Sequence, residues 1–279
     1  FMMNLIKNYV KFFKNNFNNI KKIITIHDYQ WLYPDDPNIL SYNLYKKEFN
    51  KKNAENFLEL IDLCDNIIFP SYNILKNYNN LIDLKSINNK IIVNHHCDKF
   101  VNHNKFLIPK IDKYINVAFV GNYIEYKGSK VFKYLFNNVK YHETYIIKYH
   151  IFGYLSDEEK NNKIIDENFI YHGNYDEDNL NKILIDNKIH LLTHLSLFEE
   201  SYCYALTNSI NSGLPILYIN HGAFTERLIK NNRYFPTSVN DLIKTFQETL
   251  KYIFKNQNQN NNINNNNNLQ INKWYINNY

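Results

Sequence analysis

Short apolar runs alternate with amphipathic segments along most of the chain, and this alternation limits the fold more than any other feature. The run 23–26 is uncharged and rich in β-branched residues, which is typical of a strand covered on both faces of a parallel sheet. Apolar residues at helical spacing follow near 51–64, and the next apolar run, 66–69, stops at Pro70. Strands that alternate with helices indicate βαβ units. We therefore predict an α/β fold with parallel sheets.

The same alternation continues in two series. Strands are predicted at residues 23–26, 66–69, 91–93, 115–120, 145–152, 169–172, 189–192 and 216–219. Helices are predicted at residues 1–20, 51–64, 72–79, 129–136, 177–186, 203–211, 224–230 and 239–255. A polar stretch around Pro109 is predicted to link the two series. The predicted parts are an α/β domain in 1–109, a second in 110–238, a C-terminal helix in 239–255 and a tail in 256–279.

The tail has a composition unlike the rest of the chain. It is rich in Asn and Gln and includes five consecutive asparagines at 264–268. Such a segment cannot bury a core, so we predict that 256–279 is largely disordered.

Composition excludes several classes of protein. Hydrophobic residues make up 44% and charged residues 21%, which is ordinary for a globular chain. No apolar stretch is long enough for a transmembrane helix. The formal net charge of +5 comes from lysines spread singly along the chain, so we expect no nucleic-acid partner. Cys64, Cys97 and Cys203 lack C-x-x-C spacing, which favours reduced thiols in the cytoplasm over a zinc site.

The residues that follow each strand are the candidates for chemistry, because ligands of open parallel sheets bind at the carboxyl ends of strands. Glycines there can expose backbone N–H groups to phosphate, although a glycine is also needed wherever the chain turns tightly. His95 and His96 precede Cys97, but adjacent residues of an extended segment point to different faces, which favours a structural role over a metal site. The candidate segments are His27-Asp28, Ser71, Asn94-His95, Gly121-Asn122, Gly153-Tyr154, Gly173, Glu199-Glu200 and His221-Gly222.

Taken in order, these segments resemble the GT-B glycosyltransferases of family 4 over residues 21–235. The most specific part is 198–209, Phe-Glu-Glu-Ser-Tyr-Cys-Tyr-Ala-Leu-Thr-Asn-Ser, which with Gly213-Leu214-Pro215 is similar to the family's acidic motif. Residues 222–227, Gly-Ala-Phe-Thr-Glu-Arg, are similar to a second motif of one branch. Residues 119–129 are similar to the phosphate-contacting loop, and 150–154 and 172–175 fit the next two strand ends. Residues 25–29 with Tyr33-Pro34 are similar to the segment that carries the active-site histidine.

The resemblance implies two Rossmann-like domains whose parallel sheets face a cleft. It implies retaining transfer of a sugar from a nucleotide-sugar donor to a glycan or related acceptor, with no cofactor and no metal. Glu200 and His27 would be the catalytic residues. The positions that match donor-binding residues are Gly121, Asn122, Lys127, Gly153, Gly173, Ser201, Tyr202, Asn208 and Glu226.

Two positions depart from the family pattern. Asn122 stands where the family usually has an arginine, so one of two cations for the donor diphosphate is missing. Asn208 replaces the second glutamate of the acidic motif, although an amide can still donate and accept hydrogen bonds there. These departures leave open a homologue that binds a nucleotide-sugar or a partner without turnover. An epimerase on the same fold is a second alternative.

The N-terminal domain is also shorter than the family's fold requires. The chain begins about one helix before His27, so the glycine-rich loop of the acceptor side is not included. We expect either a piece of a longer protein or a protein with an incomplete acceptor half.

Overall fold

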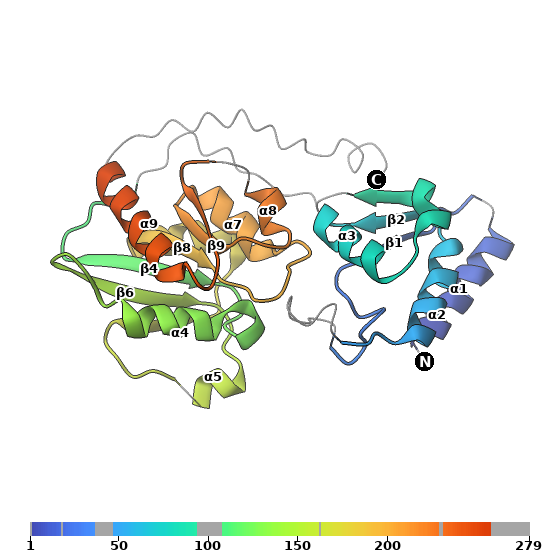
Figure 1. Ribbon diagram of the computed structural model, residues 1–279, viewed down its shortest axis with the longest axis horizontal. Helices are drawn as coiled ribbons and strands as arrows, with labels where there is room; N and C mark the ends of the chain where they lie inside the picture. The colour runs from blue at the N-terminus through green and yellow to red at the C-terminus, as the bar shows by residue number, and fades with distance from the viewer. Residues whose placement is uncertain are drawn as a thin grey trace. The chain divides into compact units, whose positions relative to one another are not determined.

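The computed structural model describes residues 2–17, 19–36, 47–93, 108–161, 163–228 and 231–257, and these form two compact units (Figure 1). The N-terminal unit contains the described residues up to 93 together with Phe198–Tyr202. The C-terminal unit contains the described residues of 108–197 and 203–257.

The N-terminal unit is a small parallel sheet with helices. Its strands pair in the order β1-β2-β3, all parallel. Side chains of Asn50 and Ser71 cap α2 and α3 by accepting hydrogen bonds from the backbone N–H groups of Asn53 and Ile74. The elements are α1 (Met2–Asn16), β1 (Ile23–Thr25), α2 (Lys51–Asp62), β2 (Asn66–Phe69), α3 (Tyr72–Leu81), the 3₁₀-helix η1 (Lys85–Lys90) and β3 (Ile91–Val93).

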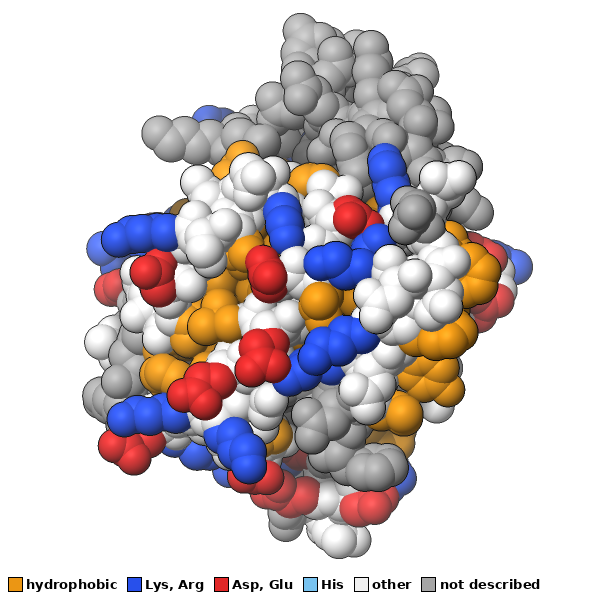
Figure 2. Space-filling model, turned by 90° about the vertical axis from the view of Figure 1, so that its right-hand side faces the viewer, with side chains coloured by type: hydrophobic (Ala, Val, Ile, Leu, Met, Phe, Trp, Pro, Cys, Tyr) orange, Lys and Arg blue, Asp and Glu red, His pale blue; other side chains and the backbone are white. Residues whose placement is uncertain are grey.

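Helix α1 packs on α2 with a lysine inward and aromatic side chains outward. Lys7 is buried and pairs with Glu59 and Asn56 of α2. Tyr9 and Phe12 are 59% and 55% exposed. Figure 2 shows hydrophobic side chains among lysines on the face turned to the viewer. The apolar period therefore predicts the helix correctly, but its aromatic side is not the side that packs within the described unit.

The C-terminal unit is a larger sheet in the order β10-β9-β8-β4-β6, with β5 and β7 both paired to β6. All pairs are parallel except β5 with β6. Its strands are β4 (Tyr114–Val120), β5 (Tyr141–His142), β6 (Tyr145–Phe152), β7 (Phe169–Gly173), β8 (Ile189–His194), β9 (Ile216–Ile219) and β10 (Tyr234–Thr237). Its helices are η2 (Glu125–Lys127), α4 (Ser129–Asn138), α5 (Asp157–Asn161), η3 (Glu177–Asn179), α6 (Leu180–Asp186), α7 (Tyr204–Ser212), α8 (Phe224–Arg227) and α9 (Leu242–Asn256).

Both faces of this sheet are covered, as the continuous apolar strands predict. Along β4, Val117 and Phe119 point into a core that includes residues of α4 and α9. Ala118 and Val120 point into a second core that includes residues of α6, α7 and α8. The predicted α/β fold with parallel sheets is confirmed.

The predicted strands, and a helix at each predicted helical site, are confirmed with small shifts at their ends. Strand β10 was missed because Pro236 makes its sequence resemble a loop; at an edge strand the missing N–H of proline is tolerated. The short elements β5, α5, η1 and η2 were also missed. Asn256, predicted to begin the tail, is instead the last residue of α9. Within the described ranges, no helix is long and apolar enough to span a bilayer.

Some sequence predictions lie outside the described residues. They concern Asn94, His95, Cys97, most of the linker around 102–112, and the tail from 258 onward.

Candidate functional site

Three glycines lie side by side at the carboxyl ends of β4, β6 and β7. The N–H of Gly121 donates to the carbonyl of Phe152 at 2.9 Å, and the N–H of Gly153 donates to the carbonyl of Gly173 at 2.8 Å. A Cβ added to Gly153 would stand 1.9 Å from the carbonyl oxygen of Gly121, so only glycine fits there. A Cβ on Gly121 would lie 3.4 Å from the Cβ of Ala205 in the first turn of α7. The three predicted glycines therefore form a side-chain-free floor next to α7.

The loop from Gly121 to Ser129 connects this floor to helix α4. Gly128 has φ +96°, and a Cβ there would stand 2.0 Å from the carbonyl oxygen of Leu195, so the loop packs closely on the end of β8. Asn122 is exposed, and Lys127 is half-buried with its ammonium 5.7 Å from the centre of the Tyr126 ring. The loop that begins at Gly121 thus carries an exposed amide and a half-buried cation.

The acidic-motif segment ends in α7, and α8 fixes the start of that helix. The buried guanidinium of Arg227 donates to the carbonyl of Cys203 at 2.8 Å and to the hydroxyl of Thr207 at 2.6 Å. Asn208 lies half-buried on α7, and Glu226 lies half-buried on the four-residue helix α8. Arg227 was not among the predicted site residues, although its motif was recognised.

The preceding residues, Phe198–Tyr202, cluster with the N-terminal unit. The hydroxyl of Ser201 donates a hydrogen bond to the carbonyl of His27, the second residue after β1. The side-chain amide of Asn77 donates to the carboxylate of Glu199 at 2.7 Å and to the hydroxyl of Tyr29 at 2.6 Å. The N-terminal unit therefore brings the predicted residues His27 and Ser201 together.

Burial distinguishes the two glutamates of this segment. Glu200 is 4% exposed and Tyr202 is also buried, whereas Glu199 is half-buried. Helix α7 begins only at Tyr204, after both glutamates, in agreement with the helix predicted at 203–211. Cys203 immediately precedes α7 and has φ +70°. Non-glycine residues rarely adopt this conformation, and it concentrates at functional turns.

Ionisable groups near the site are shifted mainly by burial. Desolvation raises the pKa of Asp28, against the lowering effects of its hydrogen bond from the Gln30 N–H and of His27. Burial also lowers the pKa of His194 to about 3, assisted by the cations Arg227 and Lys127. His194 is therefore neutral and hydrogen-bonds with the hydroxyl of Ser209 on α7 at 2.8 Å.

Asn77 is a candidate that the sequence did not reveal. It is 4% exposed on α3 and bonds to a segment 122 positions later in the chain. The one sequence signal for Asn77 is that a polar residue occupies the apolar side of a predicted helix. Among the described residues, no group of three or more His, Cys, Asp or Glu side chains is arranged to hold a metal ion.

Comparison with known proteins agrees with this architecture. The family described as "Glycosyl transferases group 1" matches residues 100–270, which is more than half of the chain. No curated protein matches the sequence.

Several solved structures share the fold at low identity. A complex of HepE from Anabaena with UDP and glucose has a TM-score of 0.64 and 11% identity, covering 91% of this chain and 68% of HepE. Sucrose-phosphate synthase from Thermosynechococcus elongatus has a TM-score of 0.66 and 11% identity, covering 89% of this chain and 63% of the enzyme. A TarM variant from S. aureus, in a complex that contains UDP, has a TM-score of 0.59 and 17% identity, covering 88% of this chain. The chain spans about half of TarM, 47% of its length.

Two parallel-sheet units that align with these structures define a protein of the GT-B fold, as the resemblance predicted. The chain belongs to the glycosyl transferases group 1 family of transferase enzymes.

Proposed function

We propose that this protein is a retaining glycosyltransferase that moves a sugar from a nucleotide-sugar donor to a glycan or related acceptor. The observation that carries the proposal is the floor of Gly121, Gly153 and Gly173 beside α7. Family membership supports it, as does UDP in the complexes of HepE and TarM. A side-chain-free floor lets a diphosphate approach the backbone closely, as glycine-rich loops at the carboxyl ends of strands do when they bind phosphate.

The donor's leaving group would lie on the loop side of this floor. When the glycosidic bond to the diphosphate breaks, negative charge grows on the phosphate oxygens and positive charge on the anomeric carbon. Lys127, half-buried in the loop, would stabilise the departing diphosphate, since a cation held where negative charge develops lowers the barrier. Gly153 and Gly173 would border the nucleoside, and Asn122 would contact the diphosphate as an uncharged hydrogen-bonding group.

The remaining predicted residues would bind the sugar and ribose. Glu200 would orient the sugar hydroxyls and His27 would contact the sugar or the acceptor. Ser201, Tyr202 and Glu226 would complete the donor site, with Asn208 at the ribose. The reaction as proposed uses no metal. A cytoplasmic location is also proposed, because the spacing of the cysteines favours reduced thiols.

A transfer assay tests this proposal. The parent protein is incubated with UDP-, GDP- and ADP-sugars, and release of nucleoside diphosphate is measured with and without glycan acceptors. Glu200→Gln should lower release about 100-fold, because loss of substrate alignment costs on that order. Glu177→Gln changes an exposed glutamate of η3 and should leave the rate unchanged.

The outcomes separate the alternatives. Nucleotide binding without turnover by the parent would refute the enzyme and support a non-catalytic binder, which the uncharged Asn122 and Asn208 favour. Conversion of the nucleotide-sugar into its epimer without an acceptor would instead identify an epimerase. The anomeric proton signal of the product decides between retention and inversion.

A further inference from the structure

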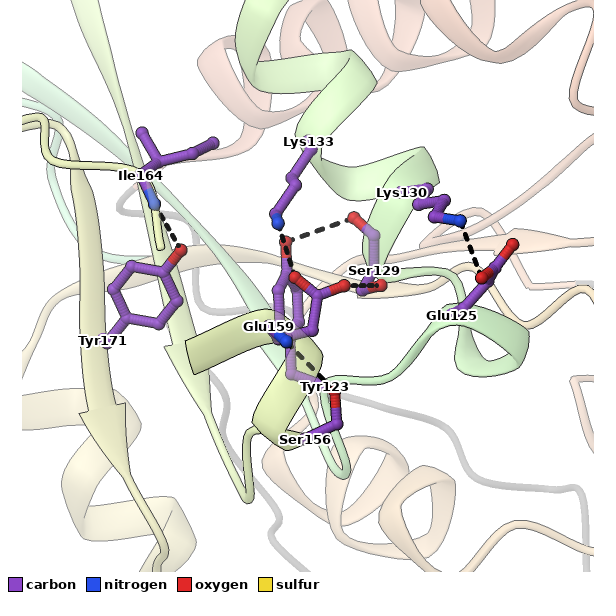
Figure 3. A network of polar contacts seen from close by, with 9 residues as sticks. All are labelled: Tyr123, Glu125, Ser129, Lys130, Lys133, Ser156, Glu159, Ile164 and Tyr171. Atoms are coloured by element: carbon purple, nitrogen blue, oxygen red, sulfur yellow. Dashed lines mark hydrogen bonds and ion pairs between the residues drawn. The ribbon is translucent and has the colours of Figure 1, made fainter. Parts of the chain in front are cut away.

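Glu159 is a buried carboxylate on an otherwise exposed surface helix. It is 3% exposed, whereas its neighbours Asp157 and Glu158 on the five-residue helix α5 are exposed. Burial of a carboxylate is costly unless the group is paired and hydrogen-bonded. Its position therefore requires partners, and they come from α4 (Figure 3).

Both oxygens of Glu159 bind the first turns of α4. The hydroxyl of Ser129 donates to one oxygen, and the ammonium of Lys133 pairs with the other. The hydroxyl of Ser156 accepts a hydrogen bond from the N–H of Glu159 at 3.2 Å, which fixes the short helix that carries it. Figure 3 shows these side chains converging between α5 and the start of α4.

Ser129 is the residue at which the loop ends and α4 begins. It is fully buried, its N–H donates to the carbonyl of Ile124 at 3.2 Å, and its carbonyl accepts from the hydroxyl of Tyr123 at 3.1 Å. The early part of the loop and its last residue are thus joined. The hydrogen bond from Ser129 to Glu159 connects this end of the loop to helix α5.

The middle of the loop is held by the segment that follows β8. The carbonyl of Tyr126 accepts from the N–H of Leu197 at 2.8 Å and from the hydroxyl of Ser196 at 3.2 Å. Lys127 and Gly128 lie between this contact and Ser129. The shape of the segment that carries the cation therefore depends on two anchors, of which Glu159 supplies one.

We propose that Glu159 is a positioning residue for the loop 121–129, the diphosphate loop. Through Ser129 it holds Lys127 and Gly128 in the conformation that binds the donor's diphosphate. This inference rests on the proposed function of that loop. Lys133 neutralises the carboxylate, so the anchor adds little net negative charge next to the phosphate site.

A double-mutant cycle on binding tests the proposal. The dissociation constant of the tightest-binding of UDP, GDP and ADP is measured by calorimetry for the parent, Glu159→Ala, Ser129→Ala and the double variant. Each single substitution should weaken binding about tenfold, and the double variant should bind no more weakly than the singles, because coupled residues are not additive. Glu158→Ala, on the same helix, should bind like the parent. Glu159→Gln, which keeps the volume, provides the same comparison if the alanine variant fails to fold.

Hydrogen exchange of the peptide 121–130, measured without nucleotide, supplies the second readout. It should speed up in Glu159→Ala and Glu159→Gln and stay unchanged in Glu158→Ala. Unchanged exchange, or unchanged nucleotide affinity in both Glu159 variants, would overturn the proposal and leave the proposed function standing. A parent that binds no nucleoside diphosphate would refute the proposed function, and the exchange rates would still decide whether Glu159 anchors the loop.

Discussion

Gly153→Ala should destabilise the C-terminal unit far more than Gly173→Ala, although both glycines have positive φ. The values of φ are +145° at Gly153 and +80° at Gly173, so an alanine is strained at either position. A Cβ at Gly153 would stand 1.9 Å from the carbonyl oxygen of Gly121, whereas a Cβ at Gly173 would meet nothing within 4 Å. The pair of variants therefore separates a backbone clash from conformational strain.

The expected magnitudes follow from these two contributions. Strain alone should cost about 1 kcal/mol at Gly173. At Gly153 the backbone of β4 and β6 must also separate, and overpacking of this kind adds about 2 kcal/mol. The alanine substitution restricts the unfolded chain equally in both variants, so this effect cancels in the comparison. Gly153→Ala should thus lose about 3 kcal/mol in total.

Urea-induced unfolding followed by circular dichroism measures both free energies. The signal must report the C-terminal unit, and Trp31, which belongs to the N-terminal unit, is unsuitable as a fluorescent probe. Equal losses in the two variants would refute the reasoning, because the clash would then contribute nothing. Gly153→Ala should also weaken nucleotide binding, since it displaces the carbonyl of Gly121 within the proposed phosphate floor.

Two further predictions concern charge. Asn122→Arg should add a second cation at the diphosphate loop and tighten nucleoside diphosphate binding about tenfold, since charge-assisted hydrogen bonds are about twice as strong as neutral ones. Calorimetry measures this affinity. An unchanged affinity would place Asn122 away from the diphosphate. Burial lowers the pKa of His150 to about 3, of His190 to about 4 and of His194 to about 3, so all three are neutral in the folded state. The unfolded chain takes up their protons near pH 6.5, so their contribution to stability is complete above that pH and is lost as the pH falls, by about 1.4 kcal/mol per pH unit for each histidine. Urea unfolding between pH 7 and 5 should show this loss, and a flat profile would contradict it.

Much of the fold could be predicted because local chemistry and tertiary packing agree. The β-branched runs are strands, and the glycines expected to follow β4 and β6 both have positive φ, with no room for a Cβ at Gly153. The site residues were predicted from the order of their motifs. Asn77 and Glu159 were not, because each acts through partners distant in sequence, and a single polar residue on a helix carries no local signal of its burial.

The sequence by itself determined most of the helices and strands and the family, because periodicity and motif spacing are local properties of the chain. Only the tertiary structure decided the strand order β10-β9-β8-β4-β6, in which β4 lies between β8 and β6, neither of which is the next strand in sequence. It also decided that Phe198–Tyr202 groups with the N-terminal unit and that Glu159 is buried against α4. These arrangements depend on which surfaces exclude water together, and that is a property of the packed chain rather than of any one segment.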